Sequence, residues 1–82
     1  MYLNDVKREI LRTLRHEPLD QYQVSGSTGI PHFQVRAELQ SLRRDRLVYQ
    51  SILGSGESAR IGWHLTARGL DVVYGQDQIE LV

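Results

Sequence analysis

Proline and glycine residues divide this chain into short segments, and this division limits it to one small fold. Pro18 follows the first run of regularly spaced apolar residues, Gly29 and Pro31 separate the next two runs, and residues 54–58 contain two more glycines. A proline disfavours the helical conformation in the residue before it, and glycine commonly ends helices, so each break marks the end of an element. Since 82 residues can build one hydrophobic core, we expect a single domain over residues 1–82.

The composition excludes several functional classes. With 40% apolar and 24% charged residues, the chain resembles an average globular domain. Cysteine is absent and the three histidines have no metal-binding spacing, so we expect no disulfide, no metal and no other cofactor. The sequence contains no run of about 18 apolar residues and no signal sequence, which predicts a cytoplasmic protein without a membrane partner.

Apolar residues spaced by three and four predict two helices in the first third of the chain. The first runs from about Asn4, a good N-cap, to His16, with its apolar stripe at Leu3, Val6, Ile10 and Leu14. A short second helix begins at Asp20, where Gln23 completes a capping-box pattern, and should end near Thr28 because Gly29 favours the left-handed conformation. Its apolar positions are Tyr22 and Val24.

A third helix is predicted over about residues 31–46, with Val35, Leu39 and Leu42 as its buried stripe. The opposite face, at 100° per residue, carries Phe33, Ala37, Gln40 and Arg44, flanked by Gln34, Arg36, Ser41 and Arg43. This face is therefore the exposed one, and it is rich in arginine and glutamine.

The next residues predict a β-hairpin and a last helix. Residues 47–53 and 60–65 alternate as strands around a glycine- and serine-rich turn at 54–58. The second strand should turn Ile61, Trp63 and Leu65 toward the core and Arg60, Gly62 and His64 away from it. Thr66 can cap a short final helix that contains Leu70 and Val73 and ends near Gly75.

This order of elements, from about Asp5 to Val73, resembles the winged helix-turn-helix regulators of the MarR, PadR and ArsR-like group. Residues 24–31 (VSGSTGIP) are similar to the end of that family's second helix and its turn, 35–48 (VRAELQSLRRDRLV) to its recognition helix and exit, and 65–69 (LTARG) to the LTxxG element after the wing. The resemblance implies an α+β, mainly α fold: three helices, a β-hairpin wing and a short C-terminal helix. The helix-turn-helix would span about residues 20–46 and the wing about 47–65.

Two positions depart from the family pattern. Arg46 stands where the family usually has glycine, and a left-handed arginine costs on the order of 1 kcal/mol, so we expect the exit turn to differ. The chain also ends soon after the predicted last helix, without the long terminal helix that many of these proteins use to dimerise.

The resemblance implies sequence-specific binding of duplex DNA, with the third helix in the major groove and the wing on the backbone or minor groove. Gln34 and Gln40 can pair with adenine, and Arg36 or Arg44 with guanine or phosphates. Phe33 either contacts a thymine methyl or sugar or packs back onto the domain, and His32 either tunes affinity with pH or is solvated and inert. The full set of candidate DNA-binding residues is His32, Phe33, Gln34, Arg36, Ala37, Gln40, Ser41, Arg43, Arg44 and, on the wing, Arg60.

The placement of charges supports this interpretation although the net charge is zero. Between Gly26 and Arg68, six arginines stand against three acidic residues, whereas the last twelve residues hold three acidic residues and no cation. Nine of the ten basic residues are arginine, which suits bidentate recognition of phosphate or guanine, but codon usage in a GC-rich genome explains this equally well.

An enzyme and a protein-interaction module are the two other functional classes for a domain of this size. An enzyme is not expected, because no polar constellation stands out and Gly54-Ser55-Gly56 lacks the lysine and spacing of a phosphate loop. A winged helix can instead serve as a protein-protein interaction module or adaptor subunit, which the zero net charge and the apolar residues of segment 78–82 fit. That segment could pair with the domain itself or seal a homodimer. The sequence thus predicts a small transcriptional regulator, such as a repressor, that is dimeric and has no small-molecule effector.

Overall fold

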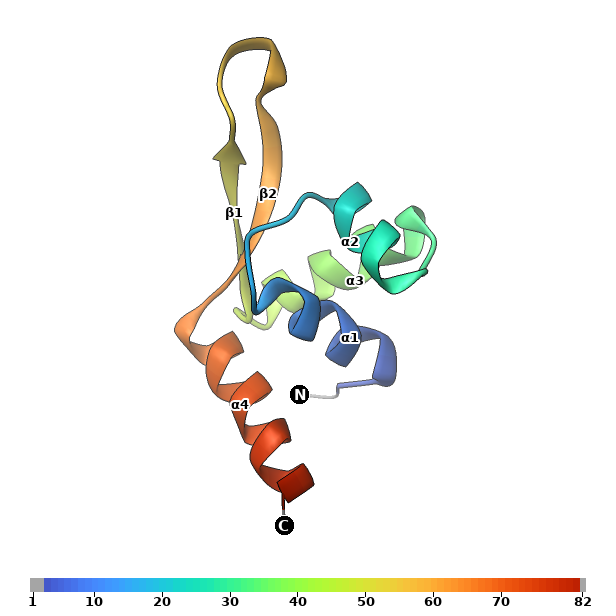
Figure 1. The fold of residues 1–82 in the computed structure, drawn as a ribbon, viewed down its shortest axis with the longest axis vertical. Helices are drawn as coiled ribbons and strands as arrows, with labels where there is room; N and C mark the ends of the chain where they lie inside the picture. The colour runs from blue at the N-terminus through green and yellow to red at the C-terminus, as the bar shows by residue number, and fades with distance from the viewer. Residues whose placement is uncertain (1–2, 82) are drawn as a thin grey trace.

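The computed structural model describes residues 3–81 and shows helices and one β-hairpin, as the sequence predicts (Figure 1). The elements are α1 (Asp5–Leu14), α2 (Gln21–Thr28), α3 (His32–Arg44), β1 (Val48–Leu53), the 3-10 turn η1 (Gly56–Ser58), β2 (Arg60–Leu65) and α4 (Ala67–Leu81). The predicted α+β, mainly α fold class is confirmed. None of the helices in the described residues is long and apolar enough to span a bilayer.

The capping residue predicted for α1 forms its hydrogen bond. Asn4 Oδ1 accepts the N–H of Lys7 at 2.8 Å, which satisfies one of the free donors of the first turn. The helix ends at Leu14, two residues before the predicted end at His16. Pro18, a little further on, prevents the helix from resuming.

Both ends of α2 lie where the sequence predicts them. Asp20 Oδ1 accepts the Gln23 N–H at 2.8 Å, and Gln23 Oε1 accepts the Asp20 N–H at 3.0 Å, which completes the capping box. Gly29 closes the helix with φ at 77°. The turn into α3 is therefore determined by local chemistry on both sides of α2.

The exit from α3 keeps the left-handed turn despite its arginine. Arg46 has φ of 62°, its N–H donates to the Arg43 carbonyl, and the Leu47 N–H donates to the Leu42 carbonyl, both at 3.0 Å. These are the two hydrogen bonds of a Schellman motif, in which Leu47 packs back against Leu42. The expectation of a different exit turn was wrong, because two hydrogen bonds and the burial of Leu47 offset the backbone strain at Arg46.

The hairpin pairs β1 with β2 antiparallel, from Val48 opposite Leu65 to Leu53 opposite Arg60. The segment before α2 adds a short bridge on the other edge of β2: the Leu19 N–H donates to the Trp63 carbonyl at 3.3 Å and the Trp63 N–H donates to the Leu19 carbonyl at 2.8 Å. The start of α2 is thereby tied to the base of the wing.

The core lies between the helices and the base of the hairpin. Its buried residues are Ile10, Leu11, Leu14, Leu19, Val24, Val35, Leu39, Leu42, Leu47, Val48, Trp63 and Val73. This set includes the predicted stripe of α3 and the predicted core tryptophan. Tyr22, predicted as an apolar position of α2, is instead 65% exposed.

The predicted alternation along β2 holds only near the core. Trp63 is buried and Leu65 is partly buried, but Ile61 is 52% exposed and Gly62 is buried beneath Leu53. The prediction for Ile61 was wrong because the outer half of the hairpin projects beyond the helices, where no core is available to cover it (Figure 1).

The start of α4 is locked to the exit of α3. Thr66 caps α4 by accepting the Gly69 N–H at 3.0 Å, and its hydroxyl donates to the Arg46 carbonyl at 2.7 Å. A Cβ added to Gly69 would lie 2.1 Å from the Leu47 carbonyl oxygen, so only glycine permits this approach. The threonine and glycine of the LTxxG element therefore have structural roles: the threonine caps α4, and the glycine permits its close contact with the exit of α3.

The last helix is longer than predicted. It continues through Gly75 to Leu81, so the predicted end near Gly75 and the description of this helix as short were wrong. A single glycine within a helix costs only about 1 kcal/mol, which the rest of the helix can offset. The apolar side chains of segment 78–82 lie outside the described residues.

We predict that Gly69→Ala lowers the free energy of unfolding by about 2 kcal/mol, because the new methyl group would force α4 away from Leu47. Gly75→Ala is the matched control: it lies in the same helix with nothing within 4 Å of an added Cβ, so alanine should stabilise the domain by about 0.5 to 1 kcal/mol. Urea denaturation of both variants measures the difference, and equal effects would refute the proposed close contact.

Arg46→Gly should stabilise the domain by about 1 kcal/mol, since glycine adopts a φ of 62° without steric conflict. Arg43→Gly, in the last turn of α3, should destabilise it by about the same amount because it weakens a regular helix. Thermal or urea unfolding distinguishes the two, and a loss of stability in Arg46→Gly would contradict the strain assigned to this turn.

Candidate nucleic-acid interface

Most of the candidate residues lie together on the outer face of α3. Exposed side chains are those of His32, Phe33, Gln34, Arg36, Ala37, Arg43 and Arg44, while Gln40 and Ser41 are half-buried. The helix buries its opposite side through Val35, Leu39 and Leu42, which fixes the rotation of the exposed face. The structure therefore brings nine of the ten candidates onto one helix surface.

The arginines of this face are exposed. No ion pair joins Arg36, Arg43 or Arg44 to any side chain that the structure describes. On α1, in contrast, Arg8 and Arg12 each lie 3.8 Å from an acidic residue one turn away. The three arginines of α3 are thus available to an external anion.

Arg60, the candidate on the wing, is the first residue of β2, as the predicted strand has it. Its Nε lies 3.0 Å from Asp20 Oδ2, a contact that the sequence did not indicate. Its side chain is still 45% exposed, whereas that of Asp20 is 16% exposed. Since Asp20 Oδ1 caps α2, the same carboxylate both starts that helix and holds the hairpin.

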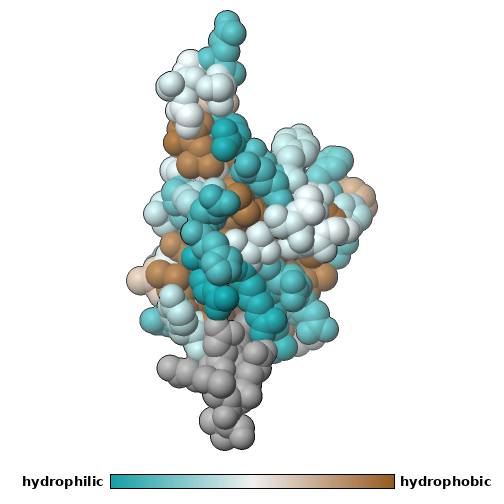
Figure 2. Space-filling model, in the orientation of Figure 1, coloured by the Kyte–Doolittle hydropathy of each residue, from teal (hydrophilic) through white to brown (hydrophobic). Residues whose placement is uncertain are grey.

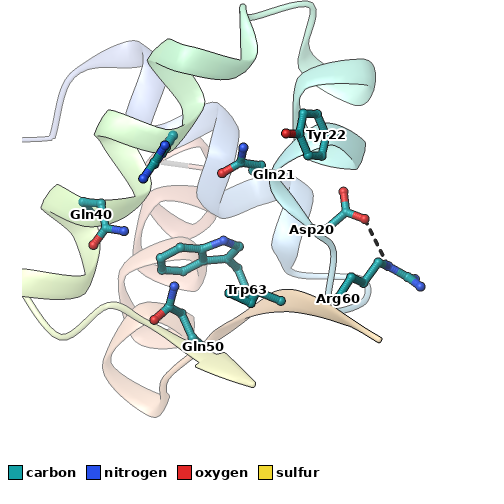
Figure 3. A pocket seen from close by; sticks show the side chains of 9 residues that line it. Asp20, Gln21, Tyr22, Gln40, Gln50, Arg60 and Trp63 are labelled. Atoms are coloured by element: carbon teal, nitrogen blue, oxygen red, sulfur yellow. Dashed lines mark ion pairs between the residues drawn. The ribbon is translucent and has the colours of Figure 1, made fainter. Parts of the chain in front are cut away.

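A groove of about 330 Å³ separates α3 from the hairpin (Figure 3). Its lining residues are Asp20, Gln21, Tyr22, Arg36, Gln40, Gln50, Arg60, Ile61 and Trp63. In Figure 3, Gln40 and Gln50 lie beside the Trp63 ring, and the Asp20–Arg60 ion pair closes one end. The groove thus combines neutral amide groups and two guanidinium groups with one carboxylate, that of Asp20, which pairs with Arg60 and leaves Arg36 as the guanidinium without an ion pair in the described residues.

Exposed aromatic rings mark the start of both helices of the helix-turn-helix. Phe33 is 70% exposed, so the alternative in which it packs back onto the domain is wrong. Its ring lies edge-on to His32, with centroids 6.4 Å apart, and His32 lies 5.6 Å from the ring of Tyr22. Sequence reasoning missed Tyr22 as a surface residue, because its spacing in α2 also fitted a buried position.

His64, in β2, has a structural role. The His64 ring stacks on Tyr49 with centroids 4.7 Å apart, and its Nε2 forms a hydrogen bond with the Ser51 hydroxyl. Within the described residues, no group of three or more histidine, aspartate or glutamate side chains could hold a metal ion.

Asp20 and Gln50 are contributors to the groove that the sequence did not reveal. Asp20 could be recognised as a helix cap, but nothing in the chain indicates that it meets Arg60, forty residues away. Gln50 is an ordinary strand residue until the hairpin places it opposite Trp63 and beside α3. Both contributions arise from packing rather than from a local pattern.

No family model and no curated protein matches the sequence. The fold, however, is closely similar to solved structures of bacterial regulators. Lactococcus lactis ZitR matches with a TM-score of 0.85 at 19% identity, covering 95% of this chain and 53% of that protein. Staphylococcus aureus MepR bound to an oligodeoxyribonucleotide matches with 0.83 at 19% identity, covering 94% and 57%.

Bacillus subtilis PadR in complex with operator DNA matches with a TM-score of 0.78 at 19% identity, covering 92% of this chain and 48% of that protein. This chain therefore spans about half the length of each of these proteins. At such low identity the similarity concerns the fold, and the chain has the winged helix-turn-helix fold of MarR- and PadR-type transcription regulators.

Proposed function

We propose that this protein binds duplex DNA sequence-specifically as a small transcriptional regulator and is not an enzyme. The observation that carries the proposal is the exposed face of α3, whose three arginines are unpaired while those of α1 are paired. The DNA-bound structures of PadR and MepR, which share this fold, support it. Regulation would follow from occupation of an operator.

In this proposal α3 enters the major groove, where the first turns of a recognition helix contact base edges. Gln34 and Gln40 pair with adenine, and Arg36 and Arg44 contact guanine or phosphates. Phe33 and Ala37 offer apolar contacts to thymine methyl groups. His32, Ser41 and Arg43 flank this surface and contact the backbone.

The groove between α3 and the hairpin would receive one strand of the DNA backbone. Arg36 and Arg60 lie on its walls, and the amide groups of Gln40 and Gln50 can donate to phosphate oxygens. Arg60 is the wing's contribution, and it reaches a phosphate by exchanging its contact with Asp20. We further propose a homodimer, which would present two α3 helices to half-sites about one helical turn apart.

The direct test is a titration of isotope-labelled protein with mixed-sequence duplex DNA, following backbone amides by NMR at low and moderate salt. Shifts should cluster on residues 31–44 and near Arg60 and should weaken as salt rises, because counterion release drives phosphate binding. Shifts confined to other surfaces, or none at all, would reject DNA binding and favour a protein-interaction module.

Replacing both Arg36 and Arg44 by alanine should weaken DNA binding by about 1 to 3 kcal/mol for each residue and reduce the salt dependence. Stability should change by less than about 0.5 kcal/mol, since both side chains are exposed and unpaired. Arg8→Ala on α1 is the control and should leave binding unchanged. Fluorescence anisotropy at several salt concentrations measures each variant, and unchanged affinity in the double variant would remove α3 as the binding face.

Asp20→Asn should strengthen DNA binding and steepen its salt dependence by about one phosphate contact, because it releases Arg60 and removes a negative charge from the groove. Asparagine still caps α2, so the helix should remain intact. Asp71→Asn on α4 removes the same charge from an exposed site and serves as control. Weaker binding by Asp20→Asn would show that the ion pair is needed to hold the wing in place.

A further inference from the structure

The strand β1 is an open edge of the hairpin. On its inner side it pairs with β2, and the outer side of β2 is bridged by Leu19. Among the described residues no backbone group pairs with the outer side of β1. In Figure 1 this strand forms the left side of the hairpin, and β2 separates it from the segment that leads into α2.

This edge lacks the features that normally prevent strands from associating. The six residues of β1 (VYQSIL) include no charge and no proline, and proteins usually protect an open edge with one or the other. Ile52 and the opposite Ile61 lie on one face of the hairpin and are 67% and 52% exposed, and Tyr49, on the other face, is 47% exposed. Figure 2 shows hydrophobic surface on the projecting hairpin.

The same edge is poorly suited to DNA. β1 offers no cation, and Arg60, the basic residue of the hairpin, reaches toward Asp20 on the other side of β2. Glu57 is the charged residue of the tip. A surface without free positive charge gains nothing from counterion release, so its exposed apolar residues need a different partner.

We propose that the β1 edge binds the β1 edge of a second copy of this chain as an antiparallel strand pair. Around a two-fold axis perpendicular to the sheet, opposed residues must point to the same face, and a register with Ser51 opposite Ser51 of the second copy satisfies this. Tyr49 then lies opposite Leu53, and Gln50 opposite Ile52. These pairs bury apolar side chains that are exposed in the single chain.

The absence of charged residues in β1 favours a second copy of this chain as the partner strand. Identical strands bring identical charges together, and such like-charge pairs are destabilising across a strand pair. Because β1 has no charge, self-pairing carries no such penalty. The pairing uses neither α3 nor the terminal segment. Gln50 of β1 also lines the groove proposed for the DNA backbone, so β1 pairing is to be followed in the absence of DNA.

Hydrogen–deuterium exchange of the full chain, measured at low and high protein concentration alongside sedimentation velocity, tests this directly. The backbone amides of Gln50 and Ile52 point away from β2, because Gln50 lies opposite Trp63, whose backbone groups pair with Leu19 on the far side. These two amides should become protected as concentration rises, in step with dimer formation. Protection confined to α1 and α4, or no change at Gln50 and Ile52, would overturn the proposal.

Ile52→Lys places a charge on the edge of both copies in the dimer. It should weaken dimer formation by about tenfold, because both lysines must lose water when the strands pair. Ile61→Lys is the matched control: it adds the same charge on the cross-strand neighbour, inside the hairpin rather than at its edge, and should retain the concentration-dependent protection. Both residues are exposed, so thermal unfolding should show intact folds. Undiminished pairing in Ile52→Lys, or equal loss in both variants, would refute pairing through the β1 edge.

Discussion

The close approach of α4 to the exit of α3 is the constraint on which the arrangement of this domain depends. Gly69 lies so near the Leu47 carbonyl oxygen that no side chain fits between them, and Thr66 joins the cap of α4 to the Arg46 carbonyl. β1 begins and β2 ends at this junction. Its geometry therefore sets the direction in which the hairpin leaves the core and the position of the wing relative to α3.

A second connection, at the start of α2, completes the DNA-facing side. Leu19 bridges Trp63, and Asp20 links the cap of α2 to Arg60. Elements from distant parts of the chain, α2, α3, β1 and β2, thereby surround one groove. The groove owes its shape to these contacts, and a ligand there would meet side chains from α2, α3 and both strands at once.

The two exposed surfaces of the domain differ in chemistry. The α3 face carries unpaired arginines and glutamine amides, which suit a polyanion, whereas the β1 edge is uncharged and apolar, which suits another strand. The two surfaces meet at β1, because Gln50 of that strand also lines the groove beside α3.

The sequence by itself determined the local features, because capping, glycine turns and apolar periodicity depend on neighbouring residues: the cap at Asn4, the capping box at Asp20, and the buried face of α3. It failed where the outcome depended on distant residues. The exposure of Ile61, the continuation of α4 past Gly75, the left-handed Arg46 and the Asp20–Arg60 ion pair were decided by tertiary structure. At Arg46 and Gly75 one unfavourable residue was outweighed by nearby hydrogen bonds and by the rest of the helix. The exposure of Ile61 and the Asp20–Arg60 ion pair depend instead on where residues remote in the chain are placed, which no local pattern reports.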